Sequence, residues 1–70
     1  MKTYYFIFNT NCQYRRCVQQ VISDNRNSAE KIMMQKYGTC WRASFTQNEF
    51  NNLIRNKKYS ELKPLTSIYV

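Results

Sequence analysis

Apolar and polar positions divide the chain into segments of strand length and helix length. Residues 4–8 are apolar at every position and mostly aromatic, which is typical of a strand covered on both faces. Residues 40–45 alternate instead, and this predicts a strand with Trp41, Ala43 and Phe45 facing the helices. The two patterns indicate a sheet with an aromatic core.

Two further segments repeat apolar residues at helical spacing, one over about residues 28–37 and one after residue 46. The faces expected to be buried are Ala29, Ile32, Met33 and Tyr37 in the first helix and Phe50, Leu53 and Ile54 in the second, with Tyr59 and Leu62 extending the second contact. Both helices are therefore expected to pack on the sheet through an apolar stripe.

Local chemistry also predicts where these helices begin and end. Asn27 followed by Glu30, and Thr46 followed by Glu49, both have the form of a capping box. Gly38, the only glycine, stands where the first helix would need a left-handed residue to stop.

Residues 14–23 leave two alternatives open. Tyr14, Cys17 and Val18 begin a helical spacing, but no capping box precedes them, and the segment ends in the β-branched Val21 and Ile22. Either a helix or a strand satisfies this pattern.

The order of the elements predicts the fold class. Pro64 excludes further helix, so residues 65–70 are expected to close the sheet as a last strand. With residues 14–23 as a strand, the prediction is one α+β domain over residues 1–70. It has a small, four-stranded, mainly antiparallel sheet with two helices on one face, in the order β-β-α-β-α-β.

Charge narrows the choice of partner. Eleven Lys and Arg against four Asp and Glu give a formal charge of +7 on 70 residues. A positive field of this kind favours polyanions or acidic protein surfaces as partners. The alternative is that the charge only keeps a small domain in solution.

The cysteines and the N-terminus bear on the compartment. Cys12, Cys17 and Cys40 are odd in number and match no zinc-ligand spacing, so we expect reduced thiols in a cytoplasmic protein with no bound metal. The apolar run at residues 4–8 is too short for a signal peptide, and no segment has the length of a membrane span.

Catalytic chemistry is not indicated. The chain has no histidine and no glycine-rich phosphate loop, and its acids Asp24, Glu30, Glu49 and Glu61 are spread along it. A cysteine nucleophile would have no base to activate it. We therefore expect a protein that is not an enzyme and uses no cofactor.

The candidate binding residues are basic or aromatic: Arg15, Arg16, Arg26, Arg42, Arg55, Lys57, Lys58, Tyr4 and Tyr5. In one hypothesis the basic side chains neutralise phosphates of RNA or single-stranded DNA while the tyrosines stack on bases. In the alternative the tyrosines pack in the core and the arginines form a solvated face.

A second hypothesis is protein binding. A first strand that is apolar on both faces, with helices on only one, leaves aromatic surface for a partner protein or a second copy of the chain to cover. In the competing interpretation, residues 14–23 form a helix that covers this face.

The chain resembles a group of small, uncharacterised proteins from phages and prophages of Firmicutes over about residues 4–62. The resemblance rests on packing and capping residues: Tyr5 to Phe8, Ala29-Glu30, Lys36-Tyr37-Gly38, Trp41, Phe45-Thr46 and Glu49-Phe50. It implies a similar fold and a mobile-element origin, and it favours a strand for residues 14–23. Arg15, Arg16 and Arg42 depart from the group, where neutral or acidic residues are expected.

The group has no established activity to transfer. Small phage proteins of this kind are often inhibitors of host machinery, anti-CRISPR proteins among them. The resemblance therefore implies an inhibitor that acts in the bacterial cytoplasm on a host protein or nucleoprotein, such as a CRISPR effector, without a membrane partner.

Overall fold

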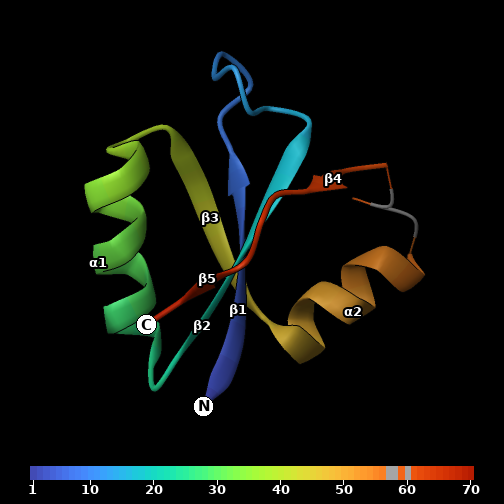
Figure 1. The fold of residues 1–70 in the computed structure, drawn as a ribbon. Helices are drawn as coiled ribbons and strands as arrows, with labels where there is room; N and C mark the ends of the chain where they lie inside the picture. Colours follow the sequence, from blue (N-terminus) through green and yellow to red (C-terminus); the bar gives the residue numbers. More distant parts are fainter. Residues whose placement is uncertain (57–58, 60) are drawn as a thin grey trace.

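The computed structural model describes residues 1–56, 59 and 61–70. Its elements are β1 (Lys2–Phe8), β2 (Cys17–Ser23), α1 (Arg26–Tyr37), β3 (Trp41–Thr46), α2 (Gln47–Arg55), β4 (Lys63–Pro64) and β5 (Ile68–Tyr69) (Figure 1). The five-stranded sheet has the order β3-β1-β2-β4, with β5 also paired to β2. The predicted α+β class is therefore confirmed.

Residues 17–23 form a strand. β2 runs antiparallel to β1, with Lys2 opposite Ser23 and Ile7 opposite Val18. Tyr14 lies in the turn before this strand. The helical spacing of this segment arises because β2 is covered on both faces, which removes the simple alternation of an exposed strand.

The end of the chain forms two short strands, β4 and β5, where one was expected. Both run parallel to β2. Between them the buried side chain of Gln19 donates from Nε2 to the Thr66 carbonyl at 2.7 Å, and its Oε1 accepts from the Tyr37 hydroxyl at 2.8 Å. A side chain thus takes the place of a backbone partner, and this interrupts the pairing of the last strand.

The helices lie on opposite faces of the sheet, so the prediction that both cover one face is wrong (Figure 1). Tyr4, Phe6 and Phe8 of β1 point into one core cluster, and Ile7 points into the other. Alternate side chains of a strand point to opposite faces, and each apolar set of β1 is covered by its own helix.

The two core clusters differ in size. The cluster on the α1 face contains the buried residues Tyr4, Phe6, Phe8, Cys12, Val21, Ala29 and Met33. The cluster on the α2 face contains Ile7, Val18 and Phe50, with Tyr5, Ala43, Phe45, Tyr59 and Leu62 packed against it. The predicted contact of Tyr59 and Leu62 is thus confirmed, whereas Ile54 remains 41% exposed.

The helix ends follow the local chemistry in part. The box at α2 is confirmed: Glu49 N–H donates to Thr46 Oγ1 at 3.2 Å and Thr46 N–H donates to Glu49 Oε1 at 2.8 Å. Gly38 ends α1 with a φ of 63°, in the left-handed region that favours glycine.

The N-cap of α1 is Asn25 and not Asn27. The Asn25 side chain accepts from Ser28 N–H at 2.8 Å, and the Ser23 hydroxyl donates to the Asn25 carbonyl at 2.6 Å. These two bonds begin the helix at Arg26, directly after β2, and leave Asn27 in its first turn.

A β-bulge separates Trp41 from the residues expected to share its face. The β1–β3 register shifts between Ile7 and Phe8. Trp41 therefore packs on the α1 face, edge-on to Phe6 at 5.1 Å between ring centroids, while Ala43 and Phe45 pack on the α2 face. Simple alternation along residues 40–45 missed this change of face.

Candidate binding surface at the basic end of the sheet

Strand directions bring four basic residues to one end of the sheet. β1 ends at Phe8, while β2 and β3 begin there, so the loop of residues 9–16 lies beside the start of β3 (Figure 1). The start of β4 joins them, because Lys63 N–H donates to the Arg16 carbonyl at 2.9 Å. We call Arg15, Arg16, Arg42 and Lys63, all exposed, the basic end.

Most acidic side chains lie at the opposite end. Asp24 is in the β2–α1 turn, and Glu30 and Glu49 are near the starts of the two helices. Glu49 Oε1 pairs with Arg26 Nη2 at 3.1 Å. Glu61, two residues before Lys63, is the acid nearest in sequence to the basic end. Three of the four acids thus lie away from the basic end, where they share the opposite end with Lys2 and Arg26.

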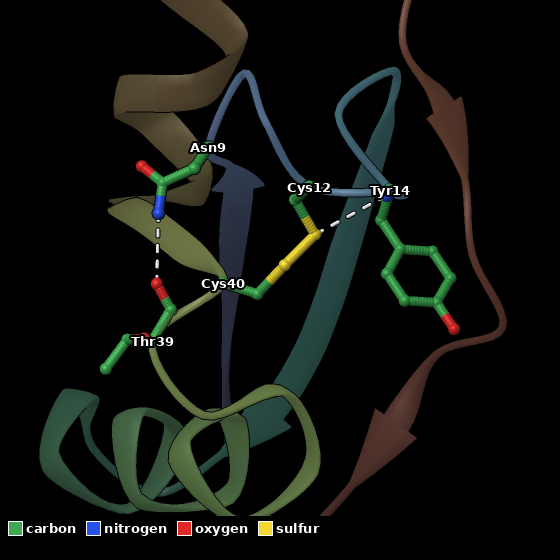
Figure 2. The surroundings of a disulfide bond; sticks show 5 residues. All are labelled: Asn9, Cys12, Tyr14, Thr39 and Cys40. Atoms are coloured by element: carbon green, nitrogen blue, oxygen red, sulfur yellow. Dashed lines mark hydrogen bonds between the residues drawn. A yellow bond between two sulfur atoms is a disulfide. The ribbon is translucent and has the colours of Figure 1, made fainter.

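A disulfide joins the loop of the basic end to the start of β3 (Figure 2). Cys12 and Cys40 are bonded, with Cα atoms 5.8 Å apart, and Cys17 is a free thiol. The expectation of three reduced cysteines is therefore wrong. The partners are 28 residues apart in sequence, and only the antiparallel return of β3 beside β1 brings them together.

Hydrogen bonds reinforce this link. Asn9 N–H donates to the Cys40 carbonyl at 2.8 Å, and Asn9 Nδ2 donates to the Thr39 carbonyl at 2.9 Å. Tyr14 N–H donates to Cys12 Sγ at 3.5 Å (Figure 2). The backbone that carries Arg15 and Arg16 is thus tied to β3, which carries Arg42.

Aromatic rings support the loop from within. Tyr14 packs against Phe8 and Tyr37, with ring centroids 5.6 and 5.2 Å away. Burial raises the pKa of Tyr37, and nearby Tyr14 and Cys17 add to the shift, so its phenol stays neutral. Its hydroxyl donates to Gln19, which connects the loop to the C-terminal strands.

The other predicted basic residues do not join the basic end. Arg26 lies at the opposite end, where it pairs with Glu49. Its Cζ atom is 5.9 Å from the Tyr4 ring centroid. Arg55 is exposed at the last position of α2. Lys57 and Lys58 lie outside the described residues.

The two tyrosines offered for base stacking are covered by the helices. Tyr4 is 5% exposed in the α1-face cluster, and the Tyr5 ring stacks on Phe50 at 4.4 Å between centroids. They also point to opposite faces of β1, so no surface presents both rings beside Arg42. Arg42 lies beside Tyr59 instead, whose hydroxyl is 3.4 Å from Arg42 Nη2.

Lys63 and Tyr59 were not among the binding residues expected from the sequence, where Tyr59 was assigned only to the core. Lys63 precedes Pro64 in a segment without periodicity, and only its pairing with Cys17 places it beside Arg16. Exposed guanidinium groups make paired hydrogen bonds to phosphates and carboxylates, and a lysine adds a point charge. The basic end can therefore hold an anionic group on a partner.

No protein-family model, curated protein or solved structure matched this chain. Within the described part of the chain, no helix is long and apolar enough to cross a membrane.

Proposed function

We propose that this protein is a non-enzymatic binding protein of a phage or other mobile element, which inhibits a host defence nucleoprotein in the bacterial cytoplasm. In this proposal it resembles anti-CRISPR proteins in its action: it occupies an anionic surface that the host complex needs. The partner is a host protein or nucleoprotein, and the basic end is the contact surface.

The observation that carries the proposal is the grouping of basic side chains at one end of the sheet. Arg15 and Arg16 come from one loop, Arg42 from β3 and Lys63 from β4. Three of the four acids lie away from this end, so the four basic side chains give it a local excess of positive charge of the kind that attracts anionic partners.

The rigidity of the loop supports specific binding. The Asn9 hydrogen bonds hold residues 9–16 against the start of β3, and the Cys12–Cys40 bond adds to this where its thiols are oxidised. A loop that is ordered before it binds loses less conformational entropy when it meets a partner. The basic end is therefore suited to an anionic surface of defined shape.

Direct binding of RNA or single-stranded DNA is the alternative that uses the same arginines. Burial of Tyr4 and stacking of Tyr5 on Phe50 weigh against it, because sequence-tolerant binding of single strands depends on rings that can stack on bases. A nuclease step in the experiment separates the two.

The test is capture of partners from a lysate of a bacterial host, with and without nuclease treatment. We expect the wild-type protein to retain a defined set of host proteins after nuclease treatment. Arg15→Ala combined with Arg16→Ala should lose most of that set, because the exposed pair makes the densest part of the basic end.

The matched control is Lys2→Ala combined with Asn51→Glu. It lowers the net charge by the same two units but changes exposed positions on β1 and α2, away from the basic end. Equal loss of capture in both double variants would contradict the proposal. Loss of all partners on nuclease treatment, together with binding of the protein to purified RNA or single-stranded DNA, would support direct nucleic-acid binding instead.

A further inference from the structure

β3 has a free edge. It lies at the end of the strand order and pairs only with β1 among the described residues, so its other side presents backbone N–H and C=O groups without a strand partner. Proteins usually protect such edges with proline, charge or a very short strand. β3 is six residues long, contains no proline and has Arg42 as its one charged residue.

A groove borders this edge on the α1 face. It has a volume of about 490 Å³ and is lined by Asn27, Glu30, Lys31, Met34, Gln35 and Trp41. Met34 is 51% exposed, so its apolar side chain is open to a partner in the groove. Across α1 and β3, the Ser44 hydroxyl donates to Glu30 Oε2 at 3.4 Å and keeps helix and strand together.

Trp41 contributes a polar group to the same place. Its indole Nε1 is buried and has no acceptor within the described part of the chain. Buried N–H groups nearly always find an acceptor, and an unpaired one is costly. Because Nε1 is shielded from solvent, a carbonyl or carboxylate oxygen of a bound segment reaches this donor only when the Trp41 ring turns toward the groove.

The charges near the groove select an acidic occupant. Arg26 is paired with Glu49, and α1 and β3 otherwise carry the basic residues Lys31, Lys36 and Arg42 against a single acid, Glu30. The whole chain has a formal charge of +7. A second copy would bring the same positive charge to the edge, whereas an acidic segment is attracted to it.

We propose that an extended, acidic segment of a partner protein adds to the sheet as a strand along the free edge of β3, with alternate side chains in the groove between β3 and α1. The backbone hydrogen bonds supply affinity, and Met34 and Trp41 provide the apolar contact. This inference does not depend on the basic end, so either proposal can fail without the other.

The test uses a fluorescent, acetylated peptide of alternating glutamate and valine, about eight residues long, which favours an extended conformation. Fluorescence anisotropy measures the binding of this peptide and of two modified versions. One version is N-methylated at the valines and the other at the glutamates. In an extended strand these two sets of N–H groups lie on opposite edges. We expect one version to bind at least about tenfold more weakly than the other, because a strand pairs through one edge.

Two variants with the same change in charge locate the peptide. Met34→Glu places a negative charge in the groove, and Asn51→Glu places one on exposed α2. Met34→Glu should weaken binding at least about tenfold, and Asn51→Glu less than about twofold. Both positions are exposed, so circular dichroism of the two variants should match the wild type.

Three outcomes would overturn the inference: no binding of the unmodified peptide, equal binding of both methylated versions, or equal weakening by the two variants. Equal binding of the methylated versions would indicate attraction by charge alone. Sedimentation of the protein without peptide provides a further check. A dimer that Met34→Glu dissociates would assign the edge to a second copy and not to an acidic segment.

Discussion

The Tyr5 ring stacks on the Phe50 ring, with centroids 4.4 Å apart and planes 9° from parallel. Tyr5 lies on β1 and Phe50 on α2, so this contact holds α2 against the face of the sheet that α1 does not reach. The second apolar face of β1 is thereby covered within the chain. A partner is not needed to cover it, contrary to the argument made from the sequence.

Phe50→Ala is expected to lower the free energy of unfolding by about 3 to 5 kcal/mol, because it removes the ring under which Tyr5 and Ile7 are covered. Urea unfolding measured by circular dichroism gives this value. If Phe50→Ala does not fold, Phe50→Leu is used in its place, and it is expected to lower the free energy of unfolding by about 1 to 1.5 kcal/mol.

Ile54→Ala on the same helix is the control. Ile54 is 41% exposed, and its truncation should cost less than about 1 kcal/mol. A loss of similar size at both positions would show that α2 does not pack through Phe50.

The Cys12–Cys40 bond should stabilise the protein. A link across 28 residues of sequence is expected to add about 3 to 4 kcal/mol by restricting the unfolded chain. Cys12→Ser combined with Cys40→Ser should therefore unfold at lower urea concentration, and reductant should lower the midpoint of the wild type but not of the double variant.

Thiol labelling gives the direct check of this bond. Without reductant, denatured wild-type protein should react at Cys17 alone, and after reduction it should react at three positions. Labelling of all three cysteines before reduction would disprove the bond. Cys17→Ser is the control, since it should change neither the urea midpoint nor its response to reductant by much.

Glu49 should make the stability depend on pH in the acid range. The backbone N–H of Thr46 donates to its carboxylate and lowers the pKa of Glu49 below its usual value of 4.5, with nearby Arg26 acting in the same direction. Because the folded pKa is the lower one, this contribution is present above about pH 4.5 and is lost as pH falls through the folded pKa.

The measurement is the urea midpoint of wild type and Glu49→Gln between about pH 6 and pH 3. We expect the wild type to be more stable at pH 6 and the difference to shrink toward pH 3. The carboxylate is exposed, so the difference is small even at pH 6. A difference that does not change with pH would contradict the assigned role of the Glu49 carboxylate.

Features that depend on a few neighbouring residues could be predicted from the sequence. The Thr46–Glu49 box, the Gly38 stop and the strand at residues 4–8 all follow from local chemistry. Asn25 and Asn27 are both good N-caps, and the choice between them depended on the bond from Ser23, which the sequence does not reveal.

Features that depend on distant residues could not be predicted. The apolar stripe of α2 does not say which face of the sheet it covers, and the bulge that turns Trp41 away from Ala43 arises from pairing with β1. Arg15 and Arg16 were identified as candidate binding residues, but their proximity to Lys63 depends on the parallel pairing of β2 and β4. Charge can be counted along a chain, whereas its grouping requires the fold.

Retention on a heparin column tests the central claim, that the basic end is a surface for anions. Arg15→Ala combined with Arg16→Ala and Lys2→Ala combined with Asn51→Glu have the same net charge, two units below the wild type. If the basic end makes the contact, the arginine variant elutes at clearly lower salt than the control. The arginine variant also releases about two fewer salt ions than the control when it binds heparin, which is measured as a weaker dependence of its affinity on salt concentration. Elution of both variants at the same salt would show that the positive charge acts as a diffuse field, and the account of a binding surface would be wrong.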